Sequence, residues 1–223
     1  EPLAAHTLGW RGATSLRMSE LGYQNKTTFT VSNNDLATYV RDLASAVATP
    51  APRFEHIGLY HADGSRKQIS THILQIANEY YAAARPKQPL RNNELPTLAL
   101  ATRGIAYLEL RLTDINPEDP CGVSLEQLRL LETFMLWVIL NPEPPQHHAS
   151  RDENAHNRLR TACCGLSDGF SLKQARHDRP IQDAALELLA AMQPIAARLD
   201  AERGGSASSD ALAALTREVA DKT

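Results

Sequence analysis

Residues 104–117 read GIAYLELRLTDINP, a run in which apolar and polar side chains alternate. Alternation of this kind predicts a β-strand, because successive side chains of a strand point to opposite faces of the sheet. We expect one face to be apolar and buried, and it consists of Leu108, Leu110 and Leu112. We expect the other face to carry Tyr107, Glu109, Arg111 and Thr113. The stretch therefore separates a core-forming face from a face with reactive groups.

On the second face, a carboxylate and a guanidinium are neighbours. Glu109 and Arg111 are two residues apart, which corresponds to about 6.6 Å along a strand. This spacing suits a metal ion and an anionic oxygen bound next to each other, as in a nucleotide or phosphoryl site. It also suits a solvent-exposed face with a weak charge pair, which is common on protein surfaces. Alternation alone leaves both interpretations open.

The composition is that of a globular chain without a strong charge. The 223 residues are 43% hydrophobic, enough to bury a sizeable core in a single domain. The net charge of −3 provides no overall basic field, so we expect neither a nucleic acid nor an anionic membrane as partner. The longest apolar run, residues 134–140, is far below the ~20 residues of a membrane span, and there is no signal-peptide pattern. We therefore expect a cytoplasmic protein.

The cysteines and histidines do not form a recognisable metal or disulfide pattern. Cys121, Cys163 and Cys164 are odd in number and two of them are adjacent, which disfavours internal disulfides and agrees with a reducing compartment. His147 and His148 follow a proline-rich stretch, and we interpret them as a solvent-exposed loop.

Helix signals occur on both sides of the predicted strand. The run Asn33-Asn34-Asp35 provides N-cap residues for a predicted helix that ends near Thr49. The sequence of residues 124–127 resembles a capping box and predicts a core helix up to Leu140, with Phe134 and Trp137 as core residues.

Other turn and cap signals lie farther along the chain. The dipeptide Asp63-Gly64 separates residues 57–60 from 67–69 and predicts an antiparallel hairpin. Asp178 is the predicted N-cap of a helix over 181–202, with a kink at Pro194 and an end at Gly204. Ser209 or Asp210 is then expected to cap a short last helix.

Four motifs in order carry a resemblance to a known family. The segment 13–26 contains Arg17 and Tyr23, and the segment 74–79 is followed by Tyr81. Two further motifs complete the series: Arg85-Pro86-Lys87 and the strand of Glu109 and Arg111 that ends in Asp114-Ile115-Asn116-Pro117. From about residue 13 to 142 the chain is similar to bacterial glutamate–cysteine ligase of the proteobacterial type, also called gamma-glutamylcysteine synthetase.

The resemblance implies an α+β fold of the glutamine-synthetase-like kind, with a partial antiparallel sheet, packed helices and a mostly helical C-terminal third. It implies that residues 1–223 are a single domain and the C-terminal portion of such a ligase. Within it, residues 1–140 would hold the sheet and the active-site motifs, and residues 151–223 the helical region. The upstream N-terminal portion of the same enzyme is then an expected partner.

The implied reaction is the first step of glutathione biosynthesis. ATP phosphorylates the side-chain carboxylate of glutamate, and the amino group of cysteine attacks the resulting γ-glutamyl phosphate. The implied small molecules are glutamate, cysteine and ATP as co-substrate, with Mg²⁺ as the cofactor.

The resemblance also assigns roles to residues. Arg17 and Arg111 would act in catalysis by holding the transferring phosphoryl group, and Arg85 would join them in binding the nucleotide. Tyr23 and Tyr81 would bind the cysteine substrate. Glu109 would bind the metal, which agrees with the preference of Mg²⁺ for carboxylates and of phosphoryl oxygens for arginine. We expect Lys87 to be a solvent-exposed charge.

Departures from the family pattern leave other functions open. Ala77 stands where the family usually has a glutamate, and the segment 161–165 lacks the family's basic character. The chain also shows only Glu109, with Glu79 as a candidate, for a site that needs several carboxylates. We therefore expect the chain to be inactive alone. The alternatives are a non-catalytic interaction or regulatory module descended from such a ligase, and a glutamate–amine ligase with another acceptor.

Overall fold

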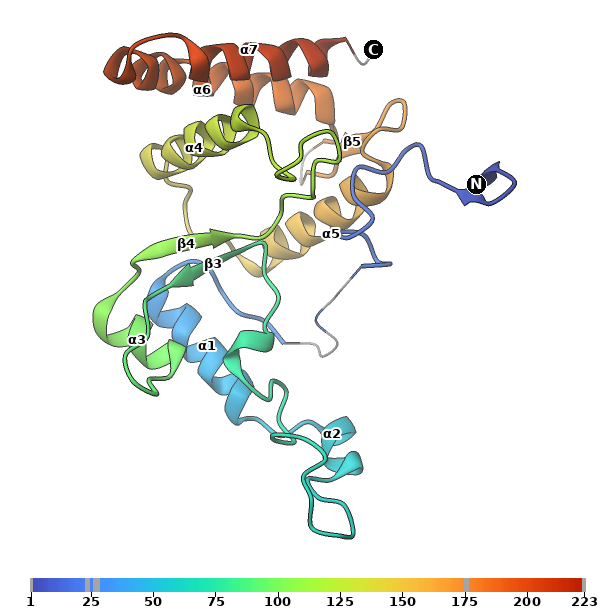
Figure 1. Ribbon diagram of the computed structural model, residues 1–223, viewed down its shortest axis with the longest axis vertical. Helices are drawn as coiled ribbons and strands as arrows, with labels where there is room; N and C mark the ends of the chain where they lie inside the picture. The colour runs from blue at the N-terminus through green and yellow to red at the C-terminus, as the bar shows by residue number, and fades with distance from the viewer. Residues whose placement is uncertain (1, 23–24, 26–28, 175–176, 222–223) are drawn as a thin grey trace. The chain divides into compact units, whose positions relative to one another are not determined.

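The computed structural model describes residues 2–22, 25, 29–174 and 177–221, which form an α+β structure as expected (Figure 1). The chain divides into two compact units. Unit 1 comprises Glu1–Gly22 and Asp114–Thr223, and unit 2 comprises Tyr23–Thr113. The expected single domain with a division near residues 140–151 stays a prediction. Among the described residues, no helix has the length and apolar composition needed to cross a bilayer.

Unit 2 is built on helices α1 and α3 and on a pair of strands. The elements are α1 (Leu36–Ala48), α2 (Pro52–Ile57), the 3₁₀ helix η1 (Ala77–Glu79), β3 (Ala84–Lys87), α3 (Pro96–Arg103) and β4 (Tyr107–Leu110). The predicted start of α1 is confirmed, because the carboxylate of Asp35 accepts a hydrogen bond of 2.7 Å from the Thr38 N–H. The core of this unit includes Tyr39, Leu43 and Leu100.

Strands β3 and β4 are antiparallel, and their register decides which residues share a face. Arg85 lies opposite Glu109, and Lys87 lies opposite Tyr107. Residues directly opposite each other in an antiparallel pair project from the same face. The predicted grouping of Tyr107 with Glu109 is therefore confirmed, and β3 adds Arg85 and Lys87 to that face.

The predicted burial of the apolar face was wrong for two of its three leucines. Leu108 and Leu112, on the apolar face, are 44% and 45% exposed, whereas Arg85 on the polar face is only 5% exposed. The reason is that η1 and α1 contact the polar face: Arg85 donates hydrogen bonds to backbone oxygens of η1 and lies beside Tyr39 of α1. Alternation shows that two faces differ, but it does not show which face the neighbouring elements cover.

The predicted hairpin of residues 57–69 is reduced to one bridge. Tyr60 pairs with Arg66, and Gly64 in the turn has a φ of 82°, so the turn itself is present. Ile57 is the last residue of α2 rather than part of a strand. Pro52 explains this difference, because proline at the first helical position favours a helix start.

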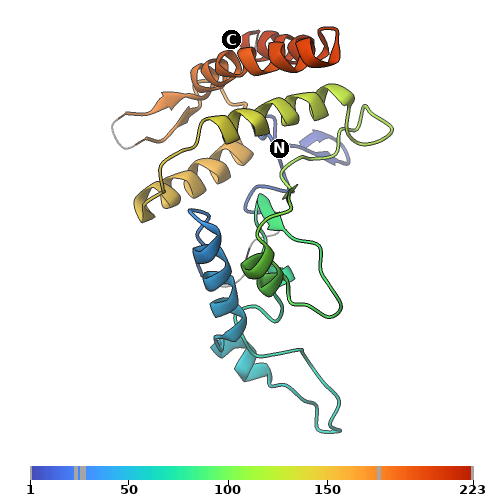
Figure 2. The same ribbon diagram turned by 90° about the vertical axis from the view of Figure 1, so that its left-hand side faces the viewer.

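Unit 1 is mostly helical. Its elements are β1 (Pro2–Ala4), β2 (Thr7–Leu8), α4 (Leu125–Leu140), α5 (His148–Cys164), β5 (Ser171–Leu172), β6 (Arg179–Pro180), α6 (Ile181–Arg203) and α7 (Ala207–Ala220). Helix α4 lies along α6 and α7 in both ribbon views (Figure 2). Phe134 and Trp137 of α4 pack against the core of α6 and α7, as predicted. The capping box is also confirmed, with Ser124 and Gln127 each accepting a hydrogen bond from the other's backbone N–H.

Other helix starts in unit 1 differ from the predictions. Pro180 rather than Asp178 precedes α6, and the Asp178 carboxylate pairs with Lys173. Helix α7 begins at Ala207, before Ser209 and Asp210. The predicted exposed loop is confirmed for His147, which precedes α5 as its N-cap residue, and is wrong for His148, which begins that helix.

Three further predictions for unit 1 concern Pro194, Gly204 and the cysteines. Helix α6 continues through Pro194 to Arg203, and the kink stays a prediction. The predicted end at Gly204 is confirmed, with a φ of 76°. Cys121, Cys163 and Cys164 are free thiols.

The N-terminus of α7 is capped by a residue from the preceding helix. The buried carboxylate of Asp200 accepts hydrogen bonds from the backbone N–H groups of Ser208 (2.8 Å) and Ser209 (2.9 Å). Ser206, the residue before α7, makes no side-chain cap bond. The Ser209 hydroxyl and these two N–H groups lower the pKa of Asp200 to about 2. A carboxylate in α6 thus satisfies the first N–H groups of α7.

We predict that Asp200→Asn lowers the melting temperature of the protein by roughly 2–4 °C at pH 7. Since the pKa of Asp200 is lower in the folded than in the unfolded state, its stabilisation is complete above about pH 4 and is lost toward pH 2. The difference in melting temperature between the two proteins should therefore shrink over this range in calorimetric scans. Asp168→Asn, at an exposed position, is the control. A constant difference from pH 7 to pH 2 would contradict the assignment.

Candidate functional site

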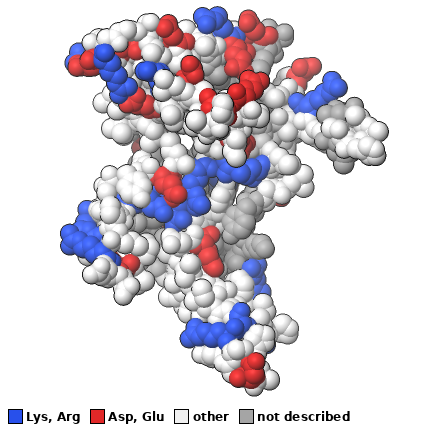
Figure 3. Space-filling view, in the orientation of Figure 1, with Lys and Arg blue, Asp and Glu red and all other residues white. Residues whose placement is uncertain are grey.

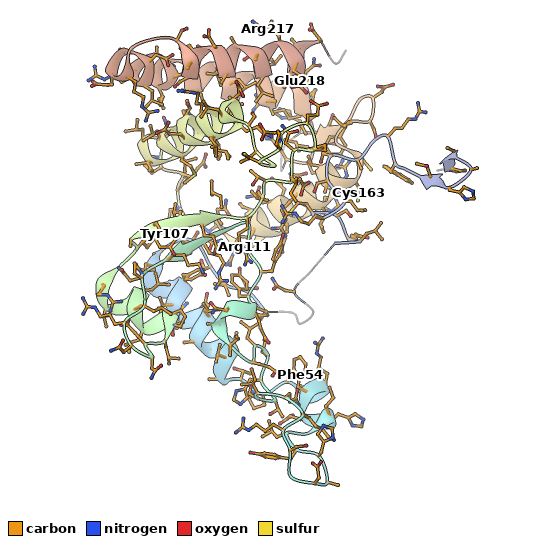
Figure 4. The ribbon with its side chains drawn as sticks, in the orientation of Figure 1. Phe54, Tyr107, Arg111, Cys163, Arg217 and Glu218 are labelled. Carbon is orange, nitrogen blue, oxygen red and sulfur yellow. The ribbon has the colours of Figure 1, made fainter. Side chains whose placement is uncertain are left out.

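The polar face of β3 and β4 gathers several of the predicted site residues. Arg85, Lys87, Glu109 and Arg111 all belong to it, and Tyr81 lies beside Arg111. Figure 3 shows basic side chains beside an acidic one over these two strands, and Figure 4 shows Arg111 and Tyr107 at opposite ends of β4. The structure thus places two arginines predicted to contact the nucleotide or phosphoryl group, the predicted metal ligand Glu109 and one predicted substrate residue in one part of unit 2.

The Glu109 carboxylate lies between two cations. Its Oε2 is 3.1 Å from Lys87 Nζ, and its Oε1 is 3.9 Å from Arg111 Nε. The Lys87 ammonium is the main cause that lowers the pKa of Glu109, followed by the charges of Arg111 and Arg85. Glu109 is therefore ionised at neutral pH and holds both flanking cations in place.

Lys87 is not the solvent-exposed charge that we expected from the sequence. Its side chain is 28% exposed and makes the shorter of the two ion pairs to Glu109. The position of Lys87 two residues after Arg85 was the available signal, because residues i and i+2 of a strand share a face. Recognising it required the register with β4, which the sequence pattern did not provide.

Arg85 lies deeper than the other cations. Its two terminal nitrogens donate hydrogen bonds of 3.3 Å to the backbone oxygens of Ala77 and Asn78. Its Nε is buried and makes no hydrogen bond within the described part of the chain. Burial raises the pKa of Tyr39, and the charge of nearby Arg85 opposes this increase. Arg85 thus holds η1 against β3, and its contact with a nucleotide stays a prediction.

Arg111 connects the polar face to Tyr81. Its backbone N–H donates to the Ala83 oxygen at 2.8 Å, which extends the pairing of the two strands by one residue. Its guanidinium carbon lies 5.8 Å from the centre of the half-buried Tyr81 ring, at the distance of a cation–π contact. Arg111 thus contacts two other residues of the predicted site, Glu109 and Tyr81.

Arg17 belongs to unit 1, where Asp114 holds it. Arg17 Nε donates a hydrogen bond of 2.8 Å to Asp114 Oδ1, and both side chains are partly exposed. A hydrogen bond from the Ser15 hydroxyl is the first cause that lowers the pKa of Asp114, and Arg17 adds to it. Asp114 is a supporting residue that the sequence analysis quoted in its motif but did not assign. Tyr23, the other predicted substrate residue, lies outside the described residues.

The segment 161–165 supports the loop that carries Arg17. The Thr14 N–H donates to the Ala162 oxygen at 3.0 Å, and the Thr14 hydroxyl donates to the Thr161 oxygen at 2.9 Å. A side chain at Gly165 would approach the Thr161 oxygen within 2.6 Å and the Thr14 methyl group within 2.9 Å. This segment at the end of α5 therefore has a structural role in fixing the loop, without any basic residue.

The side chains do not by themselves fit a magnesium ion. In the described ranges, no three His, Cys, Asp or Glu side chains come close enough together to hold a metal. Glu109 is the carboxylate of the polar face, and its oxygens face Lys87 and Arg111. Mg²⁺ takes several oxygen ligands in octahedral geometry, which one carboxylate between two cations does not provide.

Comparisons with known proteins agree on one family. The sequence profile of the family described as "Glutamate-cysteine ligase" matches residues 1–161. The glutamate–cysteine ligase of Pseudomonas paraeruginosa (strain PA7) is 42% identical over 218 residues, which cover 97% of this chain and 41% of that protein. That of Janthinobacterium sp. (strain Marseille) is 40% identical over 223 residues, 99% of this chain and 42% of that protein. The chain spans about two fifths of the length of the curated relatives that it matches.

Two solved structures are similar in fold. The crystal structure of glutamate–cysteine ligase from Francisella tularensis in complex with AMP aligns with a TM-score of 0.85 at 32% identity, over 94% of this chain and 42% of that one. A bifunctional glutathione synthetase from Pasteurella multocida aligns with a TM-score of 0.57 at 21% identity, over 94% of this chain and 22% of that one. The second match shows a shared fold alone.

We predict that Lys87→Met raises the pKa of Glu109 toward that of an ordinary glutamate, because the closest positive charge is lost. A carbon-13 NMR titration of the side-chain carboxyl groups measures this change. Lys67→Met is a matched control in the same unit, because the Lys67 ammonium donates to the Ile57 backbone oxygen. Identical Glu109 titrations in the two variants would mean that Lys87 does not pair with Glu109 in solution.

Proposed function

Because this chain belongs to the glutamate–cysteine ligase family, we propose that it supplies part of the active site of an ATP-dependent enzyme that joins L-glutamate to L-cysteine. In the proposed reaction, ATP phosphorylates the side-chain carboxylate of glutamate, which gives γ-glutamyl phosphate and ADP. The cysteine amino group then attacks the acyl carbon, a C–N bond forms, and inorganic phosphate leaves. We place this reaction in the cytoplasm, as the first step of glutathione biosynthesis.

The arrangement of Arg111 is the observation that carries this proposal. Arg111 follows β4 directly, pairs with Glu109 and lies over the ring of Tyr81. Phosphoryl transfer depends on positioning and on neutralising the charge of the transferring group, and a planar guanidinium suits both. An arginine fixed by a carboxylate on one side and an aromatic ring on the other is held in place before the substrate binds. This rigidity is what electrostatic stabilisation of a transition state requires.

The other assignments extend from this centre. Arg17, fixed by Asp114, is proposed as the second cation on the transferring phosphoryl group. Tyr81 and Tyr23 are proposed to contact the cysteine substrate, where a phenol can donate a hydrogen bond to a carboxylate. The AMP bound to the Francisella relative supports a nucleotide as co-substrate. Arg85 is proposed to act near the nucleotide. Because Arg85 is buried and bonded to η1, we propose that it acts by holding η1 in position.

Magnesium is proposed as the metal of the longer enzyme, with Glu109 as one of its ligands. The described side chains alone do not form such a site, so the remaining carboxylates would come from residues outside this chain. More than half of each curated relative lies outside the match, which provides room for them. For the same reason, we propose that the chain alone does not perform the full reaction and that it acts together with the N-terminal portion of its enzyme.

One observation favours a second candidate function. Ala77 packs against the apolar core of unit 2, at a position where the resembling family usually has a carboxylate. A non-catalytic module that descends from the ligase would tolerate this loss. A ligase with another acceptor amine also remains a candidate, because a pocket distinguishes side chains that differ by a methylene by only about 1–3 kcal/mol.

The test of the proposed function is reconstitution. The chain is assayed for ADP release with glutamate, cysteine and Mg-ATP, first alone and then mixed with the remaining part of the Pseudomonas paraeruginosa ligase. We expect steady turnover only in the mixture. Turnover by the chain alone would overturn the claim that it is incomplete, and a silent mixture without calorimetric binding of Mg-ATP would favour the non-catalytic module. Replacing cysteine with other amines in the active mixture identifies the acceptor.

We predict that Arg111→Ala lowers turnover of the reconstituted enzyme by about 10²- to 10³-fold, as expected when one fixed charge-stabilising donor is removed. Arg66→Ala is the control, because Arg66 also lies near a tyrosine ring but belongs to the loop of residues 58–70. A loss of turnover of less than about threefold would mean that Arg111 only forms a surface charge pair with Glu109.

For Glu109→Gln, we predict weaker binding of Mg-ATP at low magnesium concentration, because a neutral amide is a poorer ligand for Mg²⁺ than a carboxylate. Calorimetric titration of the reconstituted enzyme at several magnesium concentrations measures this effect, and Glu94→Gln, whose carboxylate pairs with Arg103, is the control. If Mg-ATP binding depends on magnesium in the same way in the variant and the wild type, Glu109 is not a metal ligand.

A further inference from the structure

The side chain of Asn25 binds the backbone of Tyr81 in both directions. The Tyr81 N–H donates to Asn25 Oδ1 at 2.9 Å, and Asn25 Nδ2 donates to the Tyr81 oxygen at 2.9 Å. The amide thus satisfies both backbone groups of a residue that is 56 positions away in the sequence. A backbone strand would make the same two hydrogen bonds.

Tyr81 lies between two regular elements of unit 2. It follows η1 and precedes β3. The preceding residue, Tyr80, is buried, and its ring lies 5.6 Å from that of Phe29. Phe29 therefore contacts the Tyr80 ring, and Asn25 binds the Tyr81 backbone.

We propose that Asn25 is a positioning residue for the acceptor amino acid, acting through Tyr81. Asn25 fixes the backbone of Tyr81 while the Arg111 guanidinium lies at its ring, so the direction of the Tyr81 hydroxyl is set from two sides. Asn25 also follows the other proposed substrate tyrosine, Tyr23, by two residues. The inference rests on the proposed function, because it gives the Tyr81 hydroxyl a substrate to bind.

The chain contains a second asparagine with the same geometry, which serves as a matched control. Asn157 Nδ2 donates to the Lys173 oxygen at 2.8 Å, and the Lys173 N–H donates to Asn157 Oδ1 at 2.8 Å. This contact belongs to unit 1 and joins α5 to the residue after β5. Replacing either asparagine with alanine removes the same two hydrogen bonds, but only Asn25 is bound to a proposed substrate residue.

The experiment is a double-mutant cycle in the reconstituted enzyme, with Asn25→Ala, Tyr81→Phe and the combination of both. We expect Asn25→Ala to raise the KM for cysteine on the order of 10-fold, because a displacement of an ångström at a positioning group is costly. We expect the KM values for glutamate and ATP to change less than about twofold. In the Tyr81→Phe background, Asn25→Ala should add little, because the group that it positions is already absent.

The outcomes separate this inference from the proposed function. An unchanged cysteine KM in Tyr81→Phe overturns both the role of Tyr81 and the inference. A raised cysteine KM in Tyr81→Phe together with wild-type behaviour of Asn25→Ala overturns the inference alone. Equal effects of Asn25→Ala and Asn157→Ala on all three KM values mean that the asparagine is only structural. Asn25→Asp keeps the acceptor oxygen and provides a milder variant, should Asn25→Ala not fold.

A measurement on the chain itself tests the contact without any activity. Hydrogen exchange at the Tyr81 amide should be slow in the wild-type chain and at least 10-fold faster in Asn25→Ala. Exchange at Tyr81 in Asn157→Ala should stay as in the wild type. Fast exchange in the wild-type chain would overturn the inference whether or not the reconstituted enzyme is active.

Discussion

The pairing of β3 with β4 is the constraint on which the proposed site depends. Its register places Arg85 opposite Glu109, and from this follow the ion pair of Glu109 with Lys87 and the position of Arg111 at the strand's end. A buried cation is costly unless it is neutralised or hydrogen-bonded. The carbonyl groups of η1 accept hydrogen bonds from the two terminal nitrogens of buried Arg85, and Glu109 pairs with the more exposed Lys87 and Arg111. Each of the three cations thus has a carbonyl or carboxylate partner within unit 2.

The sequence predicted the membership of each face but not its burial. Period-2 alternation is a local property, and the register confirmed that Tyr107 and Glu109 share a face. Which face is covered depends on segments far away in the chain, here η1 and Tyr39 of α1, and alternation contains no information about them. The same limit explains Lys87, whose partner was identifiable only after β3 had been aligned with β4.

Helix boundaries show the same division between local and distant causes. Asp35 and Ser124 cap their helices through residues three positions away, and both were predicted from short motifs. The cap of α7 comes from Asp200 in another helix, so the search for a cap near Ser209 failed. Of the site residues, the pattern singled out Glu109 and Arg111, whereas the roles of Tyr81 and Arg17 came from family resemblance and stay proposals.

The pairing of β3 with β4 also limits how this region can change in evolution. Because side chains alternate with a period of two, the insertion of one residue within either strand would move that strand's residues beyond the insertion to the opposite face. The connection between the strands is fixed at both ends, where the Ala106 N–H donates to the Lys87 oxygen and the Gln88 amide to the Gly104 oxygen. Length variation among related sequences should therefore concentrate in the exposed residues 90–93, where an added residue leaves the register intact.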